Sequence, residues 1–467
     1  MMLHRWIQLR ILFAAAVLLL AAQSVTSAAA GAGELTGIRF GRNAEYDRIV
    51  LDLSVMPKYT VTTENGDQRI LVTLPNVKNQ AAVTAFKSDV VRRLSIVPAA
   101  GGVALQIDLT AKTPYRVTTF VNPPRIAIDV QTSYEDVQES TPAAGMRQIK
   151  YVKKDAKGFL TAYFIIANRN AFKPETVLAN GVVPGRAPVS QMARSVGAAA
   201  AVNSVYFAPN GDIIGMLKID DKMAGTTYFR RSAVGFYPDG ETYFDFITYG
   251  GKLTMGGITC DVAGIDIERS ADNLIIYNTH YGASTKTNEY GMEYTVRGGK
   301  VVSIQTNNSR IPADGYVVSV HGKRKDDYKD VKVGDSAVLY ETLGDFWDGI
   351  PNIVGAGPTL VRAGEVQVTA GEEQFPADIA RGRAPRTAFG VTESGDYILA
   401  VADGRQSHSI GCTLQEMGAL MKKFGAVDAI NFDGGGSSEL VVKNAIVNRP
   451  SDGHERSVSA ALALVAR

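Results

Sequence analysis

The chain has 467 residues, 45% of them hydrophobic and 21% charged, with 49 Lys and Arg against 47 Asp and Glu. This length leaves room for two or three domains. The balanced charge lacks the basic excess typical of nucleic-acid-binding proteins, so nucleic acid is not an expected partner, while a local basic pocket for phosphate remains compatible with it. Only two cysteines occur, Cys260 and Cys412. Their spacing does not suit a metal site, and sequence alone does not show whether they form a disulfide.

Residues 1–30 differ in kind from the rest of the chain. Arg5 and Arg10 precede the apolar run Ile11–Ala22, and small residues follow at Ser27–Ala30. This order is typical of a secretory signal peptide, and its apolar core is short for a membrane span. It predicts an exported protein of the periplasm or cell envelope that has no membrane span after cleavage. An uncleaved N-terminal anchor is the alternative.

Residues 34–132 alternate apolar and polar side chains in short segments separated by turn residues. This period-two pattern is typical of strands with one buried face, so it predicts an all-β sandwich. The clearest segments are Arg48–Ser54, Arg69–Leu74, Val103–Leu109 and Arg125–Val130.

The pattern RIVLDLS, RILVTLPN, VALQIDL and RIAIDV resembles the AMIN domain. That resemblance implies envelope targeting, with peptidoglycan or another wall polymer as the partner. A generic β-sandwich spacer is the alternative interpretation.

Residues 133–146 are small and polar without periodicity, which predicts a linker. From 147 to 467 most segments alternate like strands, while Gln191–Ala200 and Thr413–Phe424 have helical patterns. In the second of these, Thr413 can cap the helix, with a glutamate three residues later and an apolar stripe behind it. We therefore predict an α+β fold, in which the N-terminal sandwich is joined to a larger, mainly antiparallel-sheet domain.

The most conspicuous local sequence is Asn431-Phe-Asp-Gly-Gly-Gly-Ser-Ser438. Three consecutive glycines are costly to order and unhelpful to a sheet. They suit a place where the backbone approaches a ligand closely or where its N–H groups bind an anion. A tight turn between strands is the alternative, and the run lacks the Gly-Lys-Ser/Thr of a Walker loop.

Two other segments place polar residues beside apolar strands. Ala384–Gly390 leads into the apolar strand Tyr397–Ala402, which ends in Asp403-Gly-Arg405, where charged side chains are well placed to line a cleft. The apolar segment Ala200–Phe207 is interrupted by Asn203, whose amide either has structural partners or faces a ligand.

Together these segments are similar to the phosphodiester glycosidase family, the family of the lysosomal uncovering enzyme. The resemblance runs collinearly from about residue 190 to 466 through VNSVYFAPNGD, RAPRTAFGV, VADGRQSHSIG, INFDGGGSSELVV and IVNRPSDGHERSVSAALALV. It implies that the catalytic residues are Asp433, Asp403, Arg386 and Arg405. The substrate-binding residues that it implies are Asn203, Thr387, Asn431, Gly434, Gly435, Gly436, Ser437, Asn448 and Arg456. One departure is that Ser204 and Val205 replace two family glycines, and their side chains are expected to narrow the cleft.

The resemblance implies a hydrolase that releases an N-acetylhexosamine-like sugar from a sugar-1-phosphodiester of an envelope polysaccharide. A phosphate leaving group needs little acid assistance, so the site needs one carboxylate at the anomeric carbon, first Asp433 and second Asp403. Arg386 and Arg405 are expected to grip phosphate oxygens. His408 is a candidate proton carrier, and Glu439 and Asp452 are spare acids. No cofactor is required, although a divalent cation such as calcium is compatible with these residues.

Two other functions use the same residues. A metal-dependent phosphodiesterase would cleave the P–O bond, with oxygen ligands from the aspartates, but the sequence has only five histidines and no dense carboxylate–histidine cluster. A non-catalytic polysaccharide-binding protein would keep the fold and have a site damaged at Ser204 and Val205.

Overall fold

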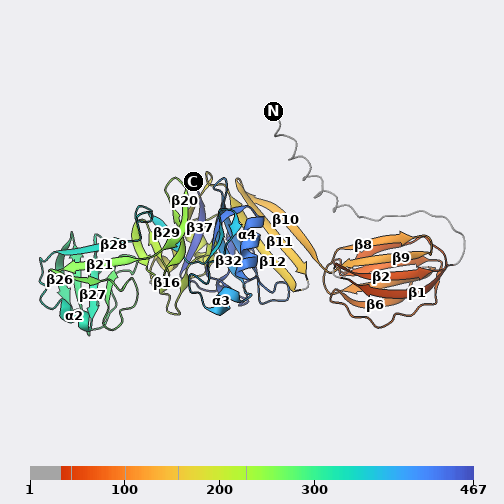
Figure 1. Ribbon diagram of the computed structural model, residues 1–467, viewed down its shortest axis with the longest axis horizontal. Coiled ribbons are helices and arrows are strands. Elements are labelled where there is room, and N and C mark those ends of the chain that lie inside the picture. Colours follow the sequence, from red (N-terminus) through yellow and green to blue (C-terminus); the bar gives the residue numbers. More distant parts are fainter. Residues whose placement is uncertain (1–32, 44, 100, 156, 228) are drawn as a thin grey trace, which may run out of the picture. The chain divides into compact units, whose positions relative to one another are not determined.

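The computed structural model describes residues 33–43, 45–99, 101–155, 157–227 and 229–467 (Figure 1). The predicted signal peptide lies outside these residues. Strands dominate the described chain and most pair antiparallel, whereas helices are few and short. The helical share implied by the α+β prediction is therefore smaller than expected. Within the described part of the chain, no helix is both long and apolar enough to cross a membrane.

The described residues form two compact units, which meet in sequence at Glu135 and Asp136; Lys153–Lys157 group with the first unit. The first unit contains two sheets, with strand orders β5-β1-β2-β9-β8 and β3-β4-β7-β6. Its strands are β1 (Gly33–Arg42), β2 (Tyr46–Leu53), β3 (Thr60–Glu64), β4 (Arg69–Pro75), β5 (Val77–Asn79), β6 (Val91–Ala99), β7 (Gly102–Leu109), β8 (Tyr115–Phe120) and β9 (Arg125–Gln131).

One hydrophobic core joins these two sheets. Leu51 of β2 and Ile128 of β9 come from the first sheet, and Val72 of β4 and Leu105 of β7 from the second; all four are fully buried. In β2 and β4 buried positions alternate with half-buried ones, as the period-two pattern predicts. The strands expected from the sequence are thus confirmed. The AMIN-like assignment remains a prediction from the sequence pattern.

The segment 133–146, expected to be a linker without regular structure, contains strand β10 (Tyr134–Ala143). β10 lies at the edge of a sheet beside β11 (Met146–Asp155). Most of its side chains are exposed, which agrees with their polar character. The prediction was wrong because edge pairing satisfies the backbone without burying side chains, so an apolar pattern is not needed there.

The second unit is built around two facing sheets. The first has the order β10-β11-β12-β33-β32-β34-β30-β31 and the second β13-β37-β14-β35-β36. The strands not yet introduced are β12 (Gly158–Ala167), β13 (Phe172–Leu178), β14 (Ala200–Asn203), β30 (Thr359–Arg362), β31 (Glu365–Val366), β32 (Arg386–Thr392), β33 (Tyr397–Ala402), β34 (Ala426–Asn431), β35 (Leu440–Val442), β36 (Ala445–Ile446) and β37 (Ala460–Ala466).

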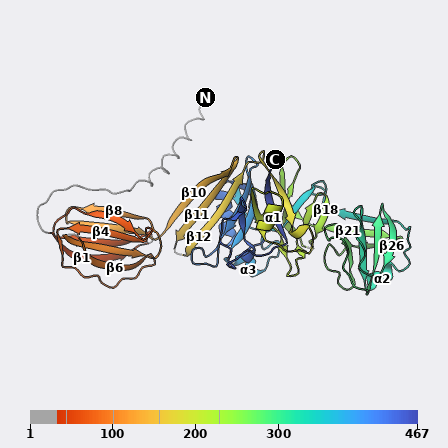
Figure 2. The same cartoon turned by 180° about the vertical axis from the view of Figure 1, so that it is seen from behind.

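These sheets form a four-layer α-β-β-α arrangement. Phe389 of β32 and Leu462 of β37 belong to the core between the sheets. Helix α4 (Leu414–Lys423) lies on the outer face of the first sheet (Figure 1), and its Met417 belongs to the core beneath it. Helix α1 (Val189–Ser195) covers the outer face of the second sheet (Figure 2).

The two helices test the helical predictions. α4 begins after Thr413, whose side chain accepts from the Glu416 backbone N–H. The Glu416 carboxylate accepts in turn from the Thr413 backbone N–H, so the predicted capping box is confirmed. The other predicted helix, Gln191–Ala200, is observed as Val189–Ser195. The helix ends early because Gly197 has φ +64°, outside the helical range, and Ala200 already belongs to strand β14.

A long insertion separates β14 from β30. Its strands are β15 (Tyr206–Phe207), β16 (Ile213–Ile214), β17 (Leu217–Ile219), β18 (Lys222–Gly225), β19 (Arg231–Phe236), β20 (Thr242–Ile247), β21 (Gly250–Met255), β22 (Ile258–Asp261), β23 (Gly264–Ile265), β24 (Leu274–Tyr277), β25 (Gly291–Arg297), β26 (Lys300–Gln305), β27 (Gly315–His321), β28 (Ala337–Thr342) and β29 (Asn352–Gly355). Two short helices complete the unit, α2 (Lys323–Asp327) within this insertion and α3 (Ala377–Arg381) after it. Cys260 lies in the insertion core and Cys412 under α4, and both thiols are free and buried.

Candidate functional site

Three of the predicted motifs meet at one end of the eight-stranded sheet. β32 begins at Arg386 beside Ala402, where its antiparallel neighbour β33 ends. On its other side, β32 pairs Ala388 with Asn431, where β34 ends. Antiparallel pairing therefore brings the start of the Pro-Arg-Thr segment next to the ends of the strands that lead into Asp403 and Asp433.

Asn203 joins the second sheet to this end of the first. It lies at the end of β14 and is 1% exposed. Its Nδ2 donates to the Asp433 backbone oxygen (2.6 Å), and its Oδ1 accepts from Thr387 Oγ1 (2.8 Å) and the Glu439 N–H (3.2 Å). The sequence left open whether this amide has protein partners or faces a ligand. In the structure both of its polar atoms have protein partners.

The glycine run after Asp433 forms a tight turn, in which Gly435–Ser437 adopt a 3₁₀ conformation. Gly435 has φ +63°, a conformation that favours glycine, and its N–H donates to Pro385 O (2.9 Å). At Gly436 a Cβ would collide with the Arg456 guanidinium. The run is therefore needed both for the turn and for close approach to an arginine.

Asp433 is only partly exposed, and its backbone N–H donates to Ser204 O (2.9 Å). Burial raises the pKa of its carboxyl to about 6. Hydrogen bonds from Ser437 and from the Gly434 N–H and the positive charge of Arg456 act in the opposite direction. The result is a carboxylate that is largely ionised at neutral pH but more basic than an ordinary aspartate.

Tyr206 is a site residue to which the sequence assigned no role. Its Oη donates to Gly357 O (3.0 Å) and accepts from Asn431 Nδ2 (3.0 Å). Burial, then the nearby charge of Asp433, raises its pKa, so it stays a neutral hydroxyl. Asn431 Oδ1 is buried and has no hydrogen-bond partner among the described residues. Asn431 was predicted to bind substrate, and this oxygen is the polar atom of its amide that no described protein group satisfies.

Arg386 is held by the scaffold. It is 3% exposed, and its Nε and Nη2 donate to the backbone oxygens of Cys412 (3.3 Å), Ile379 (2.9 Å) and Gly382 (2.7 Å). Burial lowers the pKa of this guanidinium. Two of its nitrogens are thus used to join β32 to the segments around α3 and α4, which limits the bidentate grip expected of it.

Arg405 is exposed and has φ +59°. Its two terminal nitrogens lie 3.5 Å from the position of a Cβ on Gly435. Arg456, beside Gly436, is paired with Asp452 through Nε (2.8 Å). The glycine turn therefore has two guanidinium groups beside it, and only one of them has a carboxylate partner in the described structure.

Asp403 is fully enclosed by protein groups. Its Oδ2 bonds His408 Nε2 (2.9 Å), and its Oδ1 accepts from Asn448 Nδ2 (3.1 Å) and the Arg449 N–H (2.9 Å). Its side chain has no exposed surface, whereas that of His408 is 26% exposed. The structure thus places Asp403 and Asn448 as mutual partners and His408 between the carboxylate and solvent.

Ser204 and Val205 do not project into an open cleft. Ser204 is completely buried, and Val205 is 2% exposed within the core between the sheets. The expectation that they narrow the cleft is therefore wrong, because the strand end turns Val205 inward.

Glu439 follows the glycine run in the sequence and is 2% exposed. Burial, then the charge of Glu455, raises its pKa to about 8. Glu455 Oε2 accepts from Ser190 Oγ of α1 (2.6 Å). The sequence named Glu439 only as a spare acid, since the Glu455 and Ser190 contacts exist only in the folded chain.

A metal-binding cluster is not seen in the described ranges, where no three or more His, Cys, Asp or Glu side chains are grouped to hold an ion. The calcium suggestion therefore remains a prediction from the sequence.

Comparison with known proteins bears on the C-terminal part of the chain. Residues 290–465 match the model of the phosphodiester glycosidase family. This match includes Arg386, Asp403 and Asp433 but begins after Asn203. The similarity to this family thus covers less than half of the chain, and it includes the three strand ends at which the motifs meet.

Sequence relatives match over short stretches. The chain is 39% identical over 74 residues to the SPbeta prophage-derived uncharacterized protein YomE of Bacillus subtilis, covering 16% of this chain and 12% of that protein. It is 42% identical over 67 residues to human N-acetylglucosamine-1-phosphodiester alpha-N-acetylglucosaminidase, covering 14% and 13%. The alignments thus span only about an eighth of these relatives.

Solved structures share the fold. A hypothetical protein from Synechocystis has a TM-score of 0.64 and 22% identity, covering 96% of this chain and 81% of its own. A protein from Burkholderia pseudomallei K96243 has a TM-score of 0.58 and 19% identity, covering 71% and 97%. At these identities the likeness concerns the fold alone.

Proposed function

We propose that the chain is an exported phosphodiester glycosidase, a hydrolase that releases an N-acetylhexosamine-like sugar from a sugar-1-phosphodiester in an envelope glycan. The observation that carries the proposal is the partly exposed Asp433 carboxylate, with its raised pKa, directly before a glycine turn that has Arg405 and Arg456 beside it. The family match over residues 290–465 and the motif resemblance support the same reaction.

In this reaction Asp433 acts at the anomeric carbon, as nucleophile or as the base that activates water. Its pKa of about 6 leaves it ionised at neutral pH and strengthens it as a base. The phosphate monoester leaves as a stable anion and therefore needs little proton donation. Arg405, which is exposed and has no protein acceptor among the described residues, binds the departing phosphate, and Arg456 adds positive charge beside the turn.

Asp403 has a positioning role in this mechanism. Both of its oxygens are engaged, so it holds His408 and the Asn448–Arg449 segment, which leads to Arg456. Asn203 positions Asp433 through the backbone oxygen of that residue. The tyrosine hydroxyl at 206 and the free Oδ1 of Asn431 are the neutral polar groups available to the sugar.

The cellular setting follows from the sequence patterns. The signal-peptide pattern supports export to the periplasm or envelope, and the AMIN-like pattern supports anchoring of residues 34–132 to peptidoglycan or another wall polymer.

The test is to incubate the protein with a panel of sugar-1-phosphodiesters, including UDP-N-acetylglucosamine, and to identify the products by mass spectrometry. Free sugar plus a phosphomonoester is the expected result, and Asp433→Asn is expected to lower kcat by about 10³-fold or more. Asp428→Asn, on strand β34 before the site, is the matched control and should retain turnover. Sugar-1-phosphate as the product would place the cleavage at phosphorus and contradict the proposal.

A further inference from the structure

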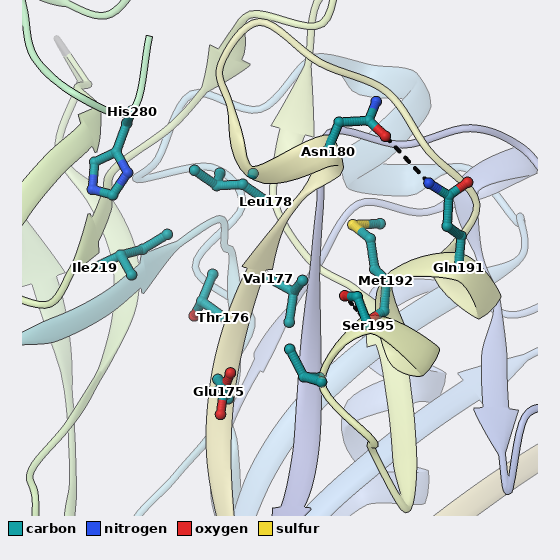
Figure 3. Close-up of a pocket in the computed structure, with 12 residues that line it drawn as sticks. Glu175, Thr176, Val177, Leu178, Asn180, Gln191, Met192, Ser195, Ile219 and His280 are labelled. Atoms are coloured by element: carbon teal, nitrogen blue, oxygen red, sulfur yellow. Dashed lines mark hydrogen bonds between the residues drawn. The ribbon is translucent and has the colours of Figure 1, made fainter. Parts of the chain in front are cut away.

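A second hollow lies in the same unit at the free edge of the five-stranded sheet (Figure 3). It has a volume of about 400 Å³, within the range of small-molecule sites. Strand β13 forms its middle. Figure 3 shows Thr176 and Leu178 on the side toward Ile219 and His280, whereas Val177 lies on the side of α1.

β13 presents unpaired backbone groups to this hollow. It is the edge strand, and its one neighbour in the described sheet is β37. The Ala179 N–H donates to Ser459 O, and the Arg467 N–H donates to Ala171 O, so odd-numbered residues bond to β37. Alternation then directs the N–H and C=O groups of Thr176 and Leu178 away from the sheet. A ligand carrying an amide can pair with these groups as a neighbouring strand would.

Two side-chain atoms in the lining also lack partners. Thr176 Oγ1 and His280 Nε2 are buried and have no hydrogen-bond partner in the described chain. Thr176 is 8% exposed. Burial lowers the pKa of His280, so its imidazole is neutral at neutral pH. Leaving such groups unpaired is costly, and a ligand with hydroxyl groups would satisfy them.

The rest of the lining favours an uncharged ligand. Among the residues that the structure describes, no lysine or arginine lines the hollow, and Glu175 is its one carboxylate. This differs from the glycine turn, which has Arg405 and Arg456 beside it. Phosphate would be poorly held here, whereas the methyl of an acetamido group would find an apolar surface on Val177 and Met192.

The strand that lines the hollow and the strand end that contacts Asp433 lie close together in the second sheet. Leu178 pairs with Ala460 of β37, whose backbone oxygen accepts from the Ser204 N–H, and Ser204 O accepts from the Asp433 N–H. Leu178 and Ser204 are thus separated by one intervening strand. With strands about 4.8 Å apart, their backbones lie about 10 Å apart.

We propose that this hollow is a subsite for an uncharged sugar unit bearing an acetamido group, in the same glycan whose phosphodiester is cleaved at Asp433. The acetamido N–H and C=O pair with the free edge of β13, and the sugar hydroxyls bond Thr176 Oγ1 and His280 Nε2. The shared glycan rests on the proposed function, whereas binding of the sugar itself does not.

The first test measures the binding of N,N′-diacetylchitobiose to the full protein by ligand-observed NMR. Saturable binding is expected, with weaker binding of cellobiose, which has the same linkage without acetamido groups. Thr176→Val removes the hydroxyl at nearly constant shape and should weaken binding about tenfold. Ser195→Trp, which fills the hollow from the rim of α1, should abolish it. Thr242→Val, on the edge strand β20, is the matched control and should bind normally.

A second measurement compares phosphodiesters with and without an added chitobiose unit. Thr176→Val should raise KM for the extended substrate relative to the short one. The subsite would be overturned if N,N′-diacetylchitobiose did not bind. It would also be overturned if Thr176→Val and Ser195→Trp bound this sugar as well as the unmodified protein does, and cellobiose bound equally well. Binding that is lost in Ser195→Trp, in a protein that cleaves no phosphodiester, would uphold the subsite and overturn the proposed function.

Discussion

At the scale of single residues, Asp433 and Asp403 show how burial separates two carboxylates of similar sequence context. Asp403 has five hydrogen bonds to protein groups on its carboxylate and backbone, including one from Ser409 Oγ, and no exposed side-chain surface. Asp433 keeps some exposure and has a pKa raised to about 6. Asp433 is therefore suited to reaction chemistry, whereas Asp403 is suited to positioning its neighbours.

This pKa predicts the acid limb of the activity profile. Asp433 must be ionised to attack or to activate water, so kcat/KM should rise with pH through about 6 and level off above it. A rate profile from pH 4 to 8, with enzyme shown to be folded throughout, measures this limb. An acid limb near pH 4, the range of an ordinary aspartate, would contradict the role of burial.

The same raised pKa predicts that the catalytic carboxylate costs stability. Its folded-state pKa lies above the unfolded value, so its contribution to folding falls as pH rises from about 4 through 6. Asp433→Asn should therefore increase the free energy of unfolding by about 3 kcal/mol at pH 7.5, with the gain shrinking toward pH 4. Denaturant unfolding at both pH values measures it, and an equal effect at both would argue against this origin.

At the scale of elements, the site depends on strand ends joined by one amide. Asn203 connects β14 with Thr387 of β32 and with the backbone of Asp433. Arg386 similarly fastens β32 to the segments around it through backbone oxygens. The polar residues of the motifs therefore hold the site together as much as they face a ligand.

Replacing Asn203 with alanine should lower both stability and activity. Three buried hydrogen bonds are lost, at about 1 kcal/mol each, so the free energy of unfolding should fall by about 3 kcal/mol. The turn containing Asp433 should also lose its position, which lowers kcat more than it raises KM. Denaturant unfolding and steady-state kinetics measure these effects. A variant with normal stability and a changed KM alone would instead place Asn203 at the substrate.

At the scale of the whole molecule, two compact units have separate cores. The buried residues of the first core all lie between Leu35 and Val130. The second unit has its own core between the facing sheets and further cores beneath α1 and α4. Each unit therefore buries enough apolar surface to unfold cooperatively by itself.

This organisation predicts that stability can be changed in one unit alone. Leu105→Ala, in the first core, should destabilise its unit by about 2–5 kcal/mol and leave turnover unchanged. Leu462→Ala, between the facing sheets, should cost a similar amount and reduce activity at elevated temperature. Calorimetry with two resolved transitions measures both. A single transition shifted by either substitution would show that the units unfold together.

The sequence by itself determined the elements in which local pattern and environment agree. The strands of the first unit follow from alternation with one buried face, and α4 follows from its capping box and apolar stripe. The glycine run also marked the site, because positive φ at Gly435 and close packing at Gly436 exclude side chains.

Only the tertiary structure decided what each polar residue of the motifs does. Asp403 and Asp433 both follow apolar strands, but their surroundings come from segments far apart in sequence, such as Asn448 for one and Ser204 for the other. β10 escaped prediction because edge pairing uses the backbone and leaves no side-chain pattern. Burial, pKa and hydrogen-bond partners depend on the folded neighbours of a group, and a linear sequence does not contain those distances.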